Sequence, residues 1–260
     1  KPYEPGDELR DLDLQTLVQS GEEEIIQRVA GRQMRVFVWV DLSGSMQRRR
    51  ESFFSCKPEI RDLAIGLLLF SAWNAYSPVG LYAFNRDTKA FFPAKGGESH
   101  CWEILDWIVA QGKRVTRAPA NVEDAIAVLM KRVPRQSLVF FVSDFQDEAF
   151  ERDFTGLLRP AARKVDFVPV IIRDPFEDRT PWRRSATIVV NDDEGDGRAE
   201  LYLTPGKLQE MRDVSARHLS HLKQSFRQLG VDHVVLDSSS PDVCYQALSA
   251  FFESRQRTRA

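Results

Sequence analysis

The stretch MRVFVWVDLSGSM (Met34–Met46) decides the fold class. Its first seven residues are dominated by apolar, β-branched and aromatic side chains, which is typical of a strand buried on both faces of a parallel sheet. Asp41 follows this strand at once, and Ser43 and Ser45 follow at alternate positions. In open α/β sheets, ligands bind at the carboxyl ends of the strands, so we expect the functional site here.

Two more apolar strands of the same kind are predicted at 137–142 and 165–172, and helices alternate with strands over most of the chain. This alternation predicts an α/β fold, a doubly wound, Rossmann-like, mostly parallel sheet with helices on both faces. A late β-hairpin interrupts the pattern, because ATIVV and AELYL flank the turn-rich NDDEGDG. Helices are expected at 58–76, 101–110, 121–132, 149–164, 207–228 and 242–255, and shorter strands at 79–84, 89–93 and 233–237.

Composition excludes several classes of protein. With 260 residues and 43% hydrophobic content, the chain can bury a sizeable core. A total of 36 basic and 38 acidic residues leaves a net charge of -2, without the basic surplus of a nucleic-acid-binding protein. The longest apolar stretch, within Leu63–Trp73, is too short to span a membrane. Three cysteines, far apart, fit neither a disulfide framework nor a zinc site, so we expect a cytoplasmic protein.

The charge distribution divides the chain. Residues 1–31 are predicted to form an N-terminal arm with a short strand, because residues 1–30 hold eight acids and three bases. Residues 32–255 form the predicted main domain, and residues 256–260 a flexible tail. The sequence starts at Lys1 rather than Met, which leaves open whether residues upstream include a membrane anchor.

The residues after the two central strands suit a metal ion. A carboxylate at Asp41 and hydroxyls at Ser43 and Ser45 form a set of hard oxygen ligands, which suits Mg²⁺ or Mn²⁺. Asp144 follows the strand at 137–142 and would add a second carboxylate through water. The alternative is that these side chains only cap helices and hold turns, as Asp and Ser do routinely.

DLSGSM resembles the D-x-S-x-S signature of the von Willebrand factor A fold, whose metal-ion-dependent adhesion site uses that loop, and Asp144 in SDF matches a further acidic position of that fold. The N-terminal YEPGDELRDLDL resembles a segment of the bacterial family called Domain of Unknown Function 58. The resemblance runs over almost the whole chain, including the late hairpin. The matching arm positions are Tyr3, Pro5, Gly6, Asp7, Arg10 and Asp13.

This resemblance implies a non-enzymatic protein-interaction module with an adhesion-type metal site. Asp41, Ser43, Ser45 and, through water, Asp144 would hold Mg²⁺ or Mn²⁺, and an Asp or Glu of a partner protein would complete the coordination. The implied partner is a MoxR-type AAA+ ATPase, and the implied role is chaperone-like maturation of other proteins.

The sequence departs from the pattern at two positions. Leu14 stands where the family has Trp, and Ala120 stands where the fold supplies a metal-binding Thr. Alanine cannot ligate a metal, and the nearby oxygens of Thr116 and Asn121 do not match the pattern. The metal site is therefore expected to be weak or absent.

Two further functions stay open. The first is a metal-free interaction scaffold on the same fold, which the alanine at position 120 favours. The second is a phosphotransferase or hydrolase that uses Asp41 as nucleophile, since Asp41 follows a buried strand. No Ser-His-Asp or Cys-His arrangement and no phosphate-binding loop is evident, so the sequence favours a binding module over an enzyme.

Overall fold

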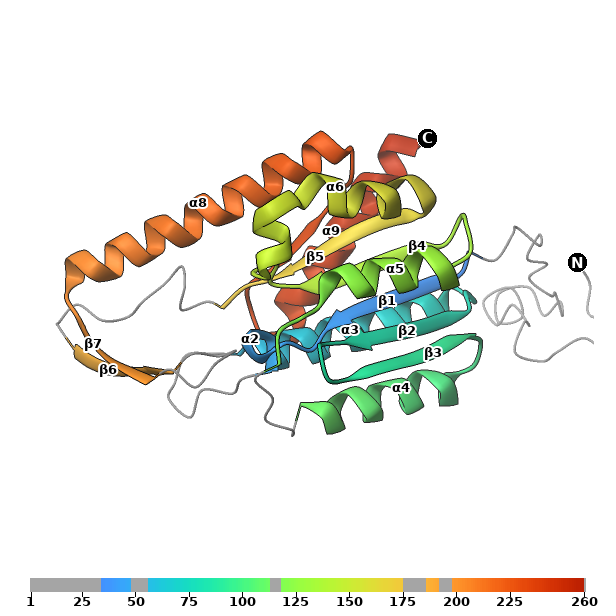
Figure 1. Cartoon of the computed structure of the whole chain (residues 1–260). Coiled ribbons are helices and arrows are strands. Elements are labelled where there is room, and N and C mark those ends of the chain that lie inside the picture. Colours follow the sequence, from blue (N-terminus) through green and yellow to red (C-terminus); the bar gives the residue numbers. More distant parts are fainter. Residues whose placement is uncertain (1–33, 48–55, 113–117, 175–185, 192–197, 260) are drawn as a thin grey trace, which may run out of the picture. The chain divides into compact units, whose positions relative to one another are not determined.

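The computed structural model describes residues 34–47, 56–112, 118–174, 186–191 and 198–259. Within the unit Met34–Ala260, six strands form one sheet in the order β3-β2-β1-β4-β5-β8 (Figure 1). All neighbouring strands are parallel except β3, which is antiparallel to β2. The strands are β1 (Val36–Asp41), β2 (Val79–Phe84), β3 (Lys89–Lys95), β4 (Leu138–Ser143), β5 (Asp166–Ile172) and β8 (Val234–Leu236).

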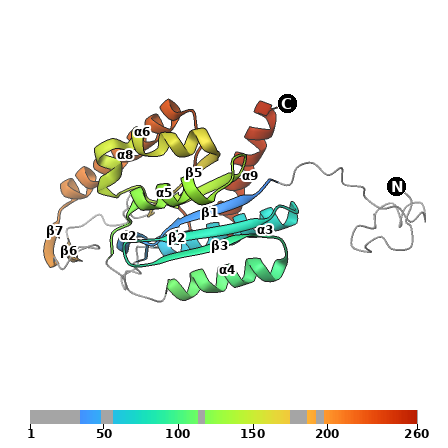
Figure 2. The same ribbon diagram turned by 45° about the vertical axis from the view of Figure 1, so that its right-hand side comes forward.

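Helices cover both faces of this sheet, which confirms the predicted doubly wound architecture (Figures 1 and 2). Strand order runs outward in both directions from β1 and β4, so the topological switch point lies between these two strands. Ligands of doubly wound folds bind at the carboxyl ends of the strands at that point. The helices are α2 (Gly44–Gln47), α3 (Lys57–Asn74), α4 (Glu98–Gln111), α5 (Val122–Arg132), α6 (Glu148–Lys164), α8 (Pro205–Leu229) and α9 (Pro241–Arg259).

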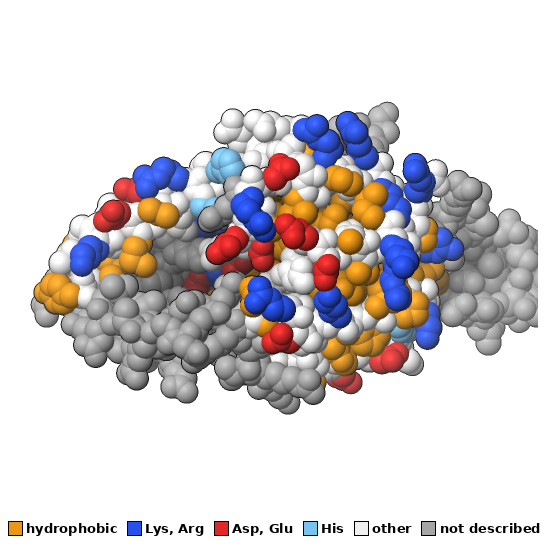
Figure 3. Space-filling view, in the orientation of Figure 1, with side chains coloured by type: hydrophobic (Ala, Val, Ile, Leu, Met, Phe, Trp, Pro, Cys, Tyr) orange, Lys and Arg blue, Asp and Glu red, His pale blue; other side chains and the backbone are white. Residues whose placement is uncertain are grey.

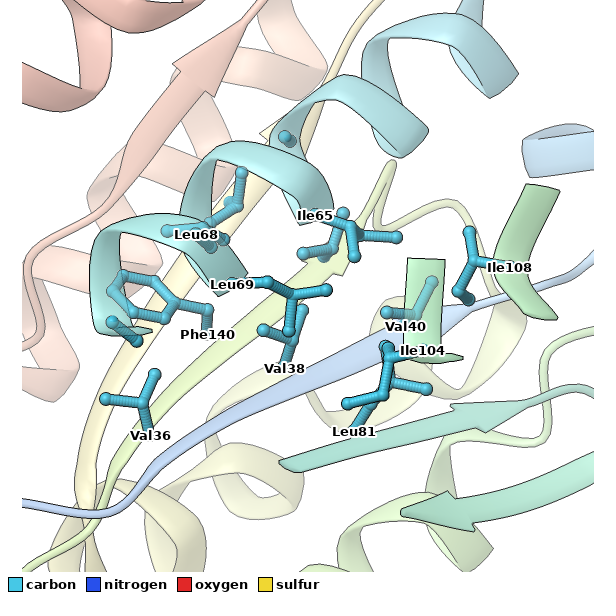
Figure 4. Packing of buried hydrophobic residues seen from close by; sticks show 14 of the residues in the cluster. Val36, Val38, Val40, Ile65, Leu68, Leu69, Leu81, Ile104, Ile108 and Phe140 are labelled. Atoms are coloured by element: carbon cyan, nitrogen blue, oxygen red, sulfur yellow. The ribbon is translucent and has the colours of Figure 1, made fainter. Parts of the chain in front are cut away.

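Strand β1 builds both halves of the core, because successive side chains of a strand point to opposite faces. Its three valines, at positions 36, 38 and 40, belong to the core on the side of α3, α4 and α9. Figure 4 shows the valines beside branched side chains of α3 and α4. The residues labelled there are Val36, Val38, Val40, Ile65, Leu68, Leu69, Leu81, Ile104, Ile108 and Phe140.

Aromatic side chains of β1 belong to the core on the opposite face. Phe37 and Trp39 pack there with residues of α5, α6 and α8. The indole Nε1 of Trp39 donates a hydrogen bond to the carbonyl oxygen of Ala125 at 3.1 Å, which fixes α5 to the sheet. Because β1 is buried on both faces, its carboxyl end is held from both sides.

The surface over α5 and α6 carries a mixture of charges. Figure 3 shows Lys and Arg side chains interspersed with Asp and Glu side chains and with hydrophobic patches on this face. One such pair joins the two helices, with Arg152 Nη2 at 3.3 Å from Glu123 Oε1. Both partners are exposed, so the pair contributes at most about 1 kcal/mol to stability.

The predicted late hairpin is confirmed. Strands β6 (Ala186–Asn191) and β7 (Arg198–Leu203) pair in antiparallel register and form a sheet of their own. The predicted N-terminal arm at 1–31 lies outside the described residues. Among the helices that the structure describes, none combines the length and the apolar character needed to cross a membrane.

The segment 256–260, predicted as a flexible tail, is helical up to Arg259 in the described part of the chain. Helix α9 continues to Arg259, four residues beyond the end expected at 255. Neither glycine nor proline follows Pro241 to end the helix. An i,i+4 ion pair between Glu253 and Arg257, at 3.8 Å, supports the last turns.

The contact between β2 and β3 provides a test of the sheet. A Cβ atom at Gly80 would lie 2.7 Å from the Phe92 carbonyl oxygen and 2.9 Å from the Ala94 nitrogen. Both are backbone atoms, so we expect Gly80→Ala to lower the free energy of unfolding by about 1–3 kcal/mol in urea denaturation. Gly96→Ala is the matched control, because a Cβ there meets nothing within 4 Å. Equal stability of both variants would contradict the β2–β3 packing.

Candidate functional site

The two predicted acidic residues lie at the switch point of the sheet. Asp41 is the last residue of β1, and Asp144 directly follows β4. These strands are hydrogen-bonded neighbours in parallel register. Both side chains are buried, with 2% and 4% of the residue exposed. The two predicted acidic residues therefore lie at neighbouring strand ends of the same sheet edge.

Hydrogen bonds hold both oxygens of the Asp41 carboxylate. Oδ1 accepts from the backbone nitrogen of Ser43 at 2.8 Å, and Oδ2 accepts from the hydroxyl of Ser143 at 2.7 Å. The Ser143 hydroxyl in turn accepts from the backbone nitrogen of Phe145 at 2.9 Å. A carboxylate has about four lone-pair positions, so these bonds leave room for a cation. Asp41 therefore joins the ends of β1 and β4 and remains a potential ligand.

The two predicted serine hydroxyls lie beside each other. Ser43 Oγ and Ser45 Oγ are 3.2 Å apart. Ser43 is buried, whereas Ser45 is half-buried at the start of α2. The pair therefore leads from the buried carboxylate toward the protein surface.

Contacts with three other segments hold the serine loop in place. The carbonyl oxygen of Leu42 accepts from Asn85 Nδ2 at 2.8 Å, beyond the end of β2. The nitrogen of Gly44 donates to the carbonyl oxygen of Ala118 at 3.1 Å, in the segment before α5. The carbonyl oxygen of Met46 accepts from Arg61 Nη1 of α3 at 3.1 Å. These hydrogen bonds fix the position of the loop at Leu42–Met46 through contacts within the chain.

A buried lysine, which the sequence reasoning missed, pairs with the second carboxylate. Lys57 Nζ lies 2.9 Å from Asp144 Oδ2, and their side chains are 7% and 3% exposed. The sequence holds one signal for this role, a basic residue in the first turn of a helix. The helix dipole disfavours a positive charge at that position, so such a residue needs another reason to be there.

Burial and charge change the acidity of Asp41. Burial raises its pKa from 3.8 to about 7, and the negative charge of Asp144 adds to this effect. Hydrogen bonds from Ser43 and Ser143 act in the opposite direction without cancelling it. A cation bound beside Asp41 would favour the ionised carboxylate. The electrostatics of the site therefore suit a positively charged ligand.

Two residues beside the site adopt left-handed backbone conformations that are uncommon for residues other than glycine. Phe145 follows Asp144 with φ of 57°, and Asn121 follows Ala120 with φ of 61°. Such conformations cost about 1 kcal/mol or more and persist where the surroundings impose them. The ring of Phe145 is buried in the aromatic core, which holds this strained turn in place.

The segment before α5, where a metal-binding Thr was expected, offers no side-chain ligand to the site. Ala120 is buried and offers no oxygen from its side chain. The side chain of Asn121 donates to Asp124 Oδ2 at 3.1 Å, within its own helix. Thr116, the other alternative from the sequence, lies outside the described residues. Asn121 therefore does not replace the missing threonine.

The residues at this edge fit Mg²⁺ or Mn²⁺ in their chemistry, because carboxylate and hydroxyl oxygens lie together. The donors would be Asp41, Ser43 and Ser45, with Asp144 shared with Lys57. Among the described residues, no group of three or more His, Cys, Asp or Glu side chains is arranged to hold a metal ion. The serine hydroxyls are thus needed to complete the donor set.

The alternative that these residues hold turns is also realised, since Asp41 accepts from the nitrogen of Ser43. Asp147 is a helix cap, because its Oδ1 accepts from the nitrogen of Ala149 at 2.8 Å. Holding the turn and binding a cation are compatible roles for Asp41.

The raised pKa of Asp41 predicts a pH dependence of stability. The folded state binds more protons than the unfolded state between pH 3.8 and about 7, so the contribution of Asp41 to stability falls as pH rises through this range. Asparagine does not titrate, so we expect the free energy of unfolding of Asp41→Asn, relative to that of the wild type, to be at least about 1 kcal/mol higher at pH 8 than at pH 5. Urea denaturation in chelator at both pH values measures this, with Asp147→Asn as control. Parallel pH profiles for wild type and Asp41→Asn would contradict it.

Comparison with known proteins gives the family. Uncharacterized proteins Rv1480 of Mycobacterium tuberculosis and Mb1516 of Mycobacterium bovis are each 23% identical over 235 residues, which cover 88% of this chain and 70% of each relative. The conserved hypothetical protein BatB from Bacteroides thetaiotaomicron has a TM-score of 0.49 at 16% identity, covering 85% of this chain and 99% of that structure. An aerotolerance-related membrane protein from Bacteroides fragilis has a TM-score of 0.48 at 12% identity, with the same coverage.

The profile of the family described as "Protein of unknown function DUF58" matches residues 1–217. The chain therefore belongs to this family.

Proposed function

We propose that this protein is a non-enzymatic protein-interaction module whose recognition site is the sheet edge formed by Asp41, Ser43, Ser45 and Asp144. The observation that carries the proposal is the arrangement of Asp41 beside the two serine hydroxyls at the topological switch point. Membership in the DUF58 family supports it.

The proposed ligand of this site is Mg²⁺ or Mn²⁺, which would supply open coordination positions for an oxygen of another protein. Ser43 and Ser45 would be direct ligands, because their hydroxyls are side by side and Ser45 lies toward the surface. Asp41 would balance the charge of the ion while it keeps the turn at Ser43 closed. An Asp or Glu side chain of the partner would complete the site, since such a carboxylate is the natural hard ligand for these ions.

The partner that the family resemblance implies is a MoxR-type AAA+ ATPase, and the proposed role is chaperone-like maturation of other proteins in the cytoplasm. In this proposal the chain carries out no chemistry of its own. Asp41 as a nucleophile is disfavoured by its burial and by the hydrogen bonds to both of its oxygens.

A metal-free interaction scaffold is the second candidate, and two observations favour it. Asp144 already has a cationic partner in Lys57. Ala120 leaves the segment before α5 without a metal ligand. In this case the same edge would recognise its partner through shape and hydrogen bonds alone.

Affinity capture distinguishes the two candidates. With the immobilised protein and a lysate of the source organism, we expect Mg²⁺-dependent retention of a partner, identified by mass spectrometry. Chelation, Asp41→Ala and Ser45→Ala should each reduce retention at least tenfold, because each removes the ion or one of its ligands.

Asp147→Asn serves as the matched control, because it changes an acidic residue of the same sheet edge whose role is to cap α6. Retention of the same partner that survives both chelation and Asp41→Ala would refute the metal-dependent mechanism and leave the scaffold.

A further inference from the structure

The buried ion pair between Lys57 and Asp144 lies within the proposed metal site. Lys57 is the first residue of α3, and its Nζ donates to Asp144 Oδ2 at 2.9 Å across 87 positions of sequence. Only 7% and 3% of the two side chains are exposed. Desolvation of both charges makes such a pair expensive, so its geometry must be good for it to persist.

The position of Lys57 cannot be explained by helix stability. A positive charge in the first turn of a helix is unfavourable, because the amino end already carries a partial positive charge. A lysine side chain also loses rotamer freedom on burial. The carboxylate of Asp144, one of the two acids at the switch point, offsets part of these costs through its ion pair with Lys57.

The charges of the cluster show what the lysine does there. Asp41 and Asp144 are buried carboxyl groups at neighbouring strand ends, and their charges repel each other when both are ionised. The ammonium group of Lys57 carries one positive charge and forms an ion pair with Asp144. A divalent cation that draws on Asp144 would be close to this ammonium group, and like charges at such a distance repel strongly where little water screens them.

The neighbouring cation on α3 has a different role. Arg61 lies one turn further along the helix and is fully buried, but its guanidinium pairs with Asp62 at 2.7 Å and holds the carbonyl oxygen of Met46. Its charge therefore has a partner outside the acidic pair. In the described part of the chain, the charge of Lys57 is directed at Asp144, one of the proposed metal ligands.

We propose that Lys57 is an internal cation that competes with divalent metal for Asp144 and so sets the metal affinity of the site. The ion pair with Lys57 holds Asp144 in place at the second strand end. Binding of Mg²⁺ or Mn²⁺ that draws on Asp144 has to overcome the repulsion of this ammonium group, whether or not it moves away. This inference rests on the proposed metal site and names the residue that controls it.

Direct measurement of Mn²⁺ binding tests the competition. Free Mn²⁺, followed by electron paramagnetic resonance, gives the dissociation constant for the wild type and for Lys57→Met, Lys57→Gln and Lys57→Arg. We expect both neutral variants to bind Mn²⁺ at least tenfold more tightly than the wild type, because the competing charge is gone. Lys57→Arg keeps the charge and should bind no more tightly than the wild type.

Lys89→Met is the matched control, because it removes one positive charge from an exposed pair with Asp124 and should leave Mn²⁺ affinity unchanged. Thermal unfolding with and without Mn²⁺ checks that each variant folds and that the metal stabilises the folded state. Two neutral replacements are used so that one misfolded variant does not decide the result.

The outcomes separate this inference from the proposed function. Tight binding by the wild type and no gain in the neutral variants would overturn the role of Lys57 and leave the metal-dependent module. Binding that appears only in the neutral variants would support the role of Lys57 and favour the metal-free scaffold for the wild type. Absence of binding in every folded variant would overturn both the competition and the metal site.

Discussion

The hydrogen bond between the carboxylate of Asp41 and the hydroxyl of Ser143, at 2.7 Å, ties the ends of β1 and β4 together at the switch point of the sheet. The other oxygen of Asp41 closes the turn at Ser43, which places the serine loop. Both groups are buried, so loss of either partner would leave a polar group without compensation, at a cost of about 1–3 kcal/mol. The geometry of the recognition edge follows from this one carboxylate.

The same burial creates the need for a positive charge. Two carboxylates at adjacent strand ends repel each other in surroundings that screen charge poorly. Among the described residues, the ammonium of Lys57 pairs with one of these carboxylates, and a set of oxygens suits a further, divalent cation. The metal-dependent module and the metal-free scaffold are therefore two ways of balancing one acidic pair. Under the proposed competition, the position of Lys57 decides between them.

Some residues of the site could be predicted from the sequence and one could not, for physical reasons. Asp41, Ser43 and Ser45 stand at alternate positions within five residues after a buried strand, so their proximity needs no tertiary information. Asp144 was also predictable, because neighbouring parallel strands end at the same edge. Lys57 was missed, since its contact with Asp144 depends on how α3 packs against the sheet over a large separation in sequence.

The amino-acid sequence by itself determined the order of strands and helices, the buried character of β1 and the residue types at its carboxyl end, because these depend on local periodicity and composition. It also placed Ala120 where a metal-binding threonine was expected. Tertiary structure alone decided that Lys57 faces Asp144, that Ser143 bridges to Asp41 and that Asn121 turns back to its own helix. These contacts join segments through packing and backbone conformation, neither of which local patterns encode.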